Sequence, residues 1–214
     1  MSVPTSSENS LHGMPDHLCA FALMHVAMRR DARRLGKAAP ALDPAMYGRV
    51  GAWWRQVRDV IDWHHRSEDD VVWPALRRRV RGFAASEKVM NHDHVALDQA
   101  MEAVSAALGS NGDRAALVSA SAWFDDLIRE HLRLEEAVVF PIFSGDLTVD
   151  EYLSIERRVL ASASAGILTF LLPWMLDQAD RTTAAKVNAT IPPPIRLFGG
   201  TLLRWRYDHS WRWW

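Results

Sequence analysis

The chain has 214 residues, about one and a half times the usual size of a domain, so we expect one domain with an extension. Its 25 basic and 26 acidic residues give a formal net charge of −1, which argues against the concentrated positive surface that nucleic-acid binding requires. The single cysteine, Cys19, excludes an internal disulfide framework and a cysteine-rich zinc site.

The N-terminal residues 1–14 are polar, and we expect them to be disordered. They contain neither the basic start nor the apolar stretch that signal peptides have. The sequence therefore predicts a cytoplasmic protein that is not secreted through a signal peptide.

Two long segments with helical periodicity follow. The first begins near Pro15, which suits an initial helical position, and ends near Gly36, which suits a position just past a helix end. The second begins after Asp43, a typical capping residue, and runs to about Gly82 with a bend expected at Pro74.

A third helix is expected from the cap Ser86 to Gly109, and a fourth from the cap Asp113 to the neighbourhood of Pro141. The connections between the four segments are short, which favours antiparallel neighbours. No segment alternates apolar and polar residues as strands do. The sequence therefore predicts an all-α fold, an up-down-up-down four-helix bundle over residues 15–145.

Residues 146–214 are predicted to form a C-terminal helical extension that packs on the bundle or on a partner. Thr148 and Glu151 form a capping-box signature at its start. The apolar stretch 159–176 is too short and too diluted by polar residues to favour a membrane span. After the break at 192–194, the end is aromatic and basic, and docking on the bundle is favoured there over a partner or a membrane surface.

The second and fourth predicted helices repeat each other at an offset of 67 residues. Each copy reads His-x-x-x-Glu-acid-x-x-Val-aromatic-Pro, beginning at His64 and at His131. Because residues four apart lie one turn above each other, His64 and Glu68 share a helix face, and so do His131 and Glu135. In both helices that face is the apolar stripe.

The first and third helices carry a fainter match around His25 and His94, which also lie on apolar stripes. A closed bundle would bring four histidines and two glutamates together in its core. Such groups are costly to bury unless they are paired or bound to a cation. Independent core residues satisfied by hydrogen bonds are the alternative, but the pseudo-twofold pattern favours two first-row metal ions with bridging carboxylates.

These motifs make the chain similar to the hemerythrin-like family, whose bacterial members are called HHE cation-binding proteins. The matching residues are His64-His65-x-x-Glu68-Asp69 with Trp73-Pro74, His131-x-x-x-Glu135-Glu136 with Phe140-Pro141, His25, and Asp93-His94. The resemblance covers residues 15–143. The segment 171–177 also resembles the C-terminal extension of actinobacterial relatives.

The resemblance implies a non-heme centre of two iron ions joined by an oxo or hydroxo bridge. It implies that the two glutamates bridge the irons and that each histidine supplies one imidazole ligand. The implied metal ligands are His25, His64, Glu68, His94, His131 and Glu135.

The sequence departs from the oxygen-carrying hemerythrins at two positions. Met90 stands where those proteins have a second histidine, one turn before the residue matching His94. They also use an aspartate five residues after its histidine, where this chain offers Glu135 at four or Glu136 at five. One imidazole fewer would leave open positions on both metals, which favours redox chemistry over reversible oxygen binding.

Other polar residues near the motif are given lesser roles. His92 lies about 200° around the helix from His94 and is expected to face outward unless the helix bulges. His65 lies off the apolar stripe and is expected to support a ligand or face the surface. Asp69, Asp93 and Glu136 are expected to be solvated, with orientation of ligating imidazoles as the alternative.

The leading hypothesis is a di-iron protein that reacts with hydrogen peroxide or dioxygen, for example by catalase-like peroxide disproportionation in an oxidative-stress role. The alternatives are a non-catalytic module that binds or senses iron, oxygen or nitric oxide, and a structural bundle without metal. Histidine and carboxylate ligands also accept manganese or zinc. The expected partners are these small molecules and a second copy bound through residues 146–214, with no nucleic acid and no membrane.

Overall fold

The computed structural model describes residues 11, 13–109, 112–190 and 203–211, and over these residues it contains helices and no strand. The α-helices are α1 (Cys19–Ala38), α2 (Tyr47–Ser67), α3 (Trp73–Arg77), α4 (Phe83–Ala107), α5 (Arg114–Gly145), α6 (Val149–Ser162), α7 (Ala165–Met175), α8 (Arg181–Thr190) and α10 (Arg204–Trp211). Short 3-10 segments are η1 (Asp16–Leu18), η2 (Ala39–Ala41) and η3 (Pro44–Met46), and a π-helical segment, η4 (Glu68–Val72), joins α2 to α3. The predicted all-α class is confirmed.

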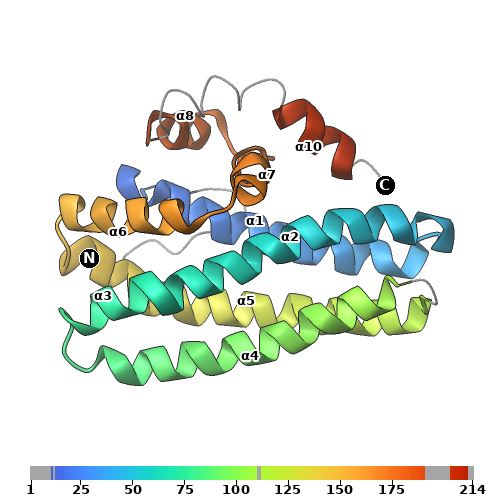
Figure 1. The fold of residues 1–214 in the computed structure, drawn as a ribbon, viewed down its shortest axis with the longest axis horizontal. Helices are drawn as coiled ribbons and strands as arrows, with labels where there is room; N and C mark the ends of the chain where they lie inside the picture. The colour runs from blue at the N-terminus through green and yellow to red at the C-terminus, as the bar shows by residue number, and fades with distance from the viewer. Residues whose placement is uncertain (1–10, 12, 110–111, 191–202, 212–214) are drawn as a thin grey trace.

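Helices α1, α2, α4 and α5 form the predicted four-helix bundle (Figure 1). Each helix packs against two others: α1 against α2 and α5, and α4 against α2 and α5. The apolar faces of the four helices meet in one continuous core. The bundle topology is confirmed, and residues from all four helices can reach the same central space.

The predicted helix starts are partly right. The Asp43 and Asp113 side chains accept hydrogen bonds from the backbone amides two residues later, as caps do. The cap predicted at Ser86 is wrong, because α4 already begins at Phe83 behind Gly82. Gly82 has a φ of +84°, a left-handed conformation that glycine adopts without steric cost. Gly36 does not end the first helix either, since α1 continues to Ala38.

The bend predicted near Pro74 takes the form of the π-helical segment η4. Proline has no amide hydrogen, and its ring crowds the carbonyl four residues earlier, which here belongs to Asp70 inside η4. The wider π turn accommodates this loss. The consequence for the bundle is local: Glu68, the first residue of η4, is placed by an altered helical turn.

The predicted disorder over residues 1–14 does not hold at Leu11 and Met14. Both side chains are buried and belong to the main apolar core. Residues 1–10 and 12 lie outside the described residues.

The C-terminal helices lie on the side of the bundle formed by α1 and α2, away from α4 and α5 (Figure 1). Helix α7 contacts α1 and α2, α8 contacts α1, and α10 contacts α2 and α7.

The predicted capping box is confirmed, since Thr148 and Glu151 exchange hydrogen bonds at the start of α6. The helix ends at Ser162 and a new one begins at Ala165, so the apolar stretch is divided between α6 and α7. No described helix has both the length and the apolar character to cross a membrane. The residues 192–194 and 212–214 lie outside the described residues.

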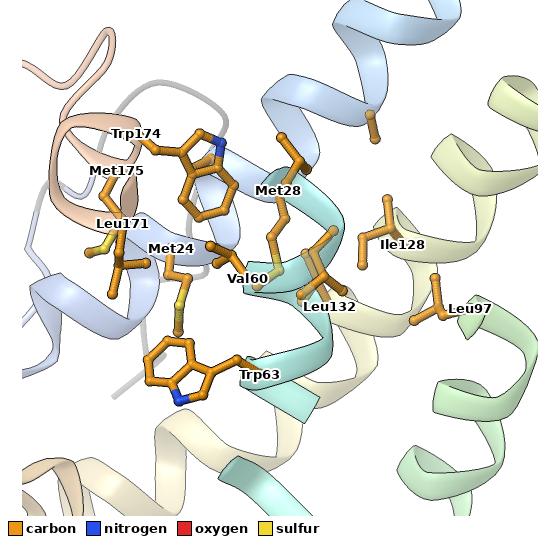
Figure 2. Packing of buried hydrophobic residues seen from close by; sticks show 14 of the residues in the cluster. Met24, Met28, Val60, Trp63, Leu97, Ile128, Leu132, Leu171, Trp174 and Met175 are labelled. Carbon is orange, nitrogen blue, oxygen red and sulfur yellow. The ribbon is translucent and has the colours of Figure 1, made fainter. Parts of the chain in front are cut away.

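Asp31 joins the bundle to α7. It is fully buried on α1 and accepts a hydrogen bond of 2.7 Å from the Trp174 indole nitrogen. The guanidinium groups of Arg30 and Arg34 also donate to it, at 2.8 and 3.1 Å. Arg30 in turn donates to the carbonyl oxygens of Trp174 and Asp177 at 2.9 and 2.7 Å. Figure 2 shows Trp174 beside Met28 of α1.

We expect the substitution Asp31→Ala to lower the free energy of unfolding by about 3 kcal/mol, because it leaves a buried guanidinium without its main carboxylate partner. Urea denaturation followed by circular dichroism measures the change. The control is Glu102→Gln, which removes an exposed ion pair with Arg58 and should cost less than about 1 kcal/mol. Equal losses in the two variants would contradict a structural role for Asp31.

Candidate metal centre

Seven buried side chains from all four bundle helices converge in the core. None is more than 5% exposed. Helix α1 supplies one histidine, α2 two, α4 one and α5 one, while one glutamate comes from η4 and one from α5. They are His25, His64, His65, Glu68, His94, His131 and Glu135.

The potential ligand atoms fall into two groups. In the two-imidazole cluster, His25 and His64 meet both glutamates, and one ligand atom from each lies within 4.8 Å of the others. In the three-imidazole cluster, nitrogen atoms of His65, His94 and His131 satisfy the same limit. Each group has the size and the donor types of a metal site.

The two glutamates reach from one cluster to the other. Oε1 of Glu68 lies 3.1 Å from His64 Nε2, and its Oε2 lies 3.4 Å from His94 Nε2. Oε1 of Glu135 lies 3.6 Å from His25 Nε2, and its Oε2 lies 3.4 Å from His131 Nε2. Each carboxylate therefore presents one oxygen to each cluster, which is the arrangement that a bridge between two metal ions requires.

One pair of positions breaks the pseudo-twofold symmetry of the site. The repeat offset that pairs His64 with His131 also pairs His65 with Leu132. The His65 ring stacks on His94 with ring centroids 4.0 Å apart, whereas Leu132 is a buried apolar residue of the core. This single difference gives one cluster a third imidazole.

The structure brings all six sequence-predicted site residues together and adds His65. The expected peripheral role of His65 is wrong in its placement, because the ring is 4% exposed and belongs to the three-imidazole cluster. His92 is exposed as predicted, and Met90 is buried but belongs to neither cluster. Helix α2 thus brings a further imidazole, that of His65, to the centre.

A signal for His65 was present in the sequence. Helix α2 has adjacent buried residues at 53–54 and 60–61 as well as at 64–65. Neighbouring residues point about 100° apart, so such pairs indicate a helix that faces two neighbours at once. In the structure, His64 meets His25 of α1 while His65 meets His94 of α4. A pattern with one inward residue per turn describes only the side of α2 that faces α1 and leaves out the side that faces α4.

A second layer of carboxylates lies behind the histidines. Glu136 is buried, and its Oε1 lies 3.0 Å from His25 Nδ1 and 2.8 Å from the Arg29 guanidinium. Asp69, at the pseudo-equivalent position, lies 3.6 Å from His94 Nδ1. Of the two, Glu136 is close enough for a hydrogen bond that fixes the ring orientation and leaves Nε2 facing the cluster.

Burial sets the charge state of most of the cluster. Burial and the neighbouring imidazoles lower the pKa of His65 well below its usual value, and burial and His131 lower the pKa of His94 to about 4. Both rings are therefore neutral near pH 7, which is the form that binds metal. Burial also raises the pKa of Glu68, and the nearby Glu135 raises it further. A cation between the carboxylates offsets this repulsion.

His131 differs from the other rings. Burial lowers its pKa, but the carboxylates of Asp93 and Glu135 outweigh that effect and raise the pKa to about 9. The ring is therefore protonated at neutral pH when no cation is bound. Binding of a metal ion at His131 has to displace that proton.

The donor atoms fit a metal pair because they are buried and make no regular hydrogen bonds. Among the described residues, all four carboxylate oxygens of Glu68 and Glu135 are buried without a hydrogen-bond partner, as are Nε2 of His25 and His64 and both ring nitrogens of His65, His94 and His131. Each such atom costs about 1–3 kcal/mol when left unsatisfied. Imidazoles and carboxylates together suit first-row divalent metals.

The comparison with known families agrees with this chemistry. The family model of the hemerythrin HHE cation binding domain matches residues 20–143 of the chain. This range covers α1 to α5 almost completely and includes every residue of both clusters.

Two curated proteins of Arabidopsis thaliana are similar to the chain. The zinc finger protein BRUTUS is 26% identical over 157 residues, which are 71% of this chain and 12% of that protein. The zinc finger protein BRUTUS-like At1g18910 is 23% identical over 208 residues, which are 87% of this chain and 16% of that protein. The chain thus spans only a small part of these relatives. No solved structure shows a significant match to it.

We expect His65→Ala to weaken the binding of one of two metal ions by at least about 100-fold, because it removes one of three imidazoles from its cluster. Competition with a chromophoric chelator measures both affinities. The matched control is His92→Ala, which truncates an exposed histidine on α4 and should leave both affinities unchanged. An unaltered affinity in the His65 variant would show that this ring is not a ligand.

Replacement of Glu136 tests the layer behind the histidines. In Glu136→Gln the charge that orients His25 is lost, so we expect metal affinity at the two-imidazole cluster to fall by about tenfold. The same chelator competition applies, with Glu130→Gln as the control because that residue forms an exposed ion pair with Arg133 at the surface. If both variants bind metal as the unmodified protein does, Glu136 has no orienting role.

Proposed function

Because the chain belongs to the hemerythrin HHE cation-binding family, we propose that it is a non-heme di-iron protein that reacts with hydrogen peroxide or dioxygen. The observation that carries the proposal is the position of Glu68 and Glu135, each of which presents one oxygen to each imidazole cluster. Two bridging carboxylates hold a pair of metal ions at a fixed separation, which a single-metal site does not require.

In this assignment His25 and His64 hold one iron, and His65, His94 and His131 hold the other. With the shared glutamates, the first iron has four protein donors and the second has five. The first iron therefore has more room for an exogenous ligand. When bound, the iron pair supplies the electrons and the free coordination positions that reaction with peroxide or dioxygen needs.

Aromatic rings cover the two-imidazole cluster. The Phe21 ring lies 4.6 Å from the His25 ring and 5.7 Å from the His64 ring, measured between centroids. Phe140 stacks on His25 at 6.4 Å. These side chains keep bulk water from the half of the site with fewer protein donors, and exclusion of water limits side reactions of oxygen species.

Peroxide disproportionation is the concrete form of the proposed reactivity. One hydrogen peroxide is oxidised to dioxygen and gives up two electrons and two protons, and a second accepts them and leaves as two water molecules. A metal pair held by the two clusters would store the electrons between the two halves. The protein residues would hold the metals and shield the site, and burial keeps His65 and His94 neutral.

Non-catalytic binding or sensing of iron, oxygen or nitric oxide is the second candidate. From the sequence we expected four inward imidazoles and open positions on both metals. With His65, the number of imidazoles at the centre is five. Because one metal would have four protein donors and the other five, the free coordination position would lie mainly at the metal held by His25 and His64. This arrangement suits reversible binding of one small molecule as well as turnover.

We expect the purified protein to contain two iron ions per chain and to evolve dioxygen when mixed with hydrogen peroxide. Metal analysis, the ultraviolet–visible spectrum and an oxygen electrode measure these properties on one sample. The control is the double substitution His64→Ala/His131→Ala, which should lose both ions and the activity. Manganese or zinc in place of iron would refute the iron assignment, and intact di-iron protein without oxygen evolution would favour the binding candidate.

A further inference from the structure

An apolar pocket separates the metal centre from the C-terminal helices. Its volume is about 70 Å³. The bundle side of its wall includes Phe21, Met24 and Trp63, and the other side is built by α6 and α7 with Ile155, Val159 and Leu171. Figure 2 shows Met24 between Trp63 of α2 and Leu171 of α7.

The pocket adjoins one half of the metal centre. His64 and Glu68 form part of its wall, and neither His65, His94 nor His131 does. It therefore borders the two-imidazole cluster, the half with fewer protein donors. At its outer side, Leu160 is 39% exposed, so the pocket wall reaches the protein surface.

Away from the His64 and Glu68 edge, the wall offers few hydrogen bonds to a guest. The Ser67 hydroxyl donates to the Trp63 carbonyl at 2.7 Å, and the Trp63 indole nitrogen donates to the Ser162 hydroxyl at 3.1 Å. Burial raises the pKa of Glu156, the other carboxyl group in the wall, to about 7, so it is about half ionised at neutral pH where an exposed glutamate is fully charged. Water is held poorly in such a space, and small apolar molecules are held well.

We propose that α6 and α7 close an apolar chamber that binds a diatomic gas, dioxygen or nitric oxide, and delivers it to the His64 and Glu68 edge of the metal centre. A volume of about 70 Å³ accommodates such a molecule. Hydrogen peroxide would give up hydrogen bonds with water on entry, whereas a diatomic gas has none to lose. The delivery step rests on the proposed metal centre, but gas binding in the chamber does not.

The family match ends at residue 143, while the outer wall of the chamber is formed by residues 152–175. The chamber is therefore a joint product of the bundle and the extension. This gives residues 146–214 a part in the chemistry of the site, because removal of α6 and α7 would expose the His64 and Glu68 edge to water.

Xenon tests the chamber directly. Crystals of the full-length protein pressurised with xenon should show one xenon atom between Met24, Trp63 and Leu171, since xenon occupies apolar cavities of this kind. Val159→Phe should displace it by filling the chamber from α6. The matched control, Ala161→Phe, adds the same ring at an exposed position of α6 outside the wall and should retain the xenon. Absence of xenon from the unmodified protein would overturn the chamber.

Rapid mixing tests delivery. With the reduced iron-loaded protein, Val159→Phe should lower the association rate constants for dioxygen and for nitric oxide by about tenfold at unchanged metal content, while Ala161→Phe leaves both near the unmodified values. If Val159→Phe loses metal or fails to fold, Ala20→Leu fills the same chamber from α1 and takes its place. A lower rate for one gas alone identifies that gas as the occupant. Unchanged rates for both would overturn delivery, whereas failure of the di-iron proposal would appear in the metal content of the unmodified protein.

Discussion

Glu68 and Glu135 lie side by side in the core of an apolar bundle, surrounded by five imidazoles and shielded from water. Burial and the nearby Glu135 raise the pKa of Glu68 and oppose its negative charge, whereas the neighbouring histidines lower the pKa of Glu135. Hydrogen bonds do not compensate the cost of burying the two carboxylates, because all four of their oxygens lack a hydrogen-bond partner among the described residues. Cations bound between the carboxylates compensate this cost. The arrangement of the helices, the orientation of the rings and the proposed chemistry all follow from the need to compensate these two carboxylates.

The two halves of the site are nearly symmetric, and the difference at His65 changes how many donor groups each half offers. The doubled motif places a histidine and a glutamate on α2 with η4 and again on α5, and each glutamate spans both clusters. The pairing of His65 with Leu132 then makes the two halves unequal. In the proposed metal pair, one metal would be more enclosed by the protein and the other would have room for a small ligand. The pocket beside His64 and Glu68 lies on the open side.

The extension and the bundle are joined by polar as well as apolar contacts. Asp31 is held by Trp174 of α7 and by Arg30 and Arg34 of its own helix, and this network fixes where α7 crosses the bundle. Leu171 lies one turn before Trp174 and faces the pocket wall. The position of a fully buried carboxylate on α1 thus determines the shape of the space beside the metal centre. The extension covers the site in addition to stabilising the fold.

The sequence by itself determined the helical class, the four-helix bundle and six of the seven side chains at the centre. The spacing of His64 with Glu68 and of His131 with Glu135 constrains a helix face directly, and His25 and His94 lie on the apolar stripes of their helices. Local signals also fixed the caps at Asp43, Asp113 and Thr148. Only the tertiary structure decided the place of His65, since whether a residue 100° from the main stripe is buried depends on a second neighbouring helix. The chamber has the same origin: its walls come from segments as far apart in the chain as residues 20–24 and 152–175, and nothing in their separate sequences records that they meet.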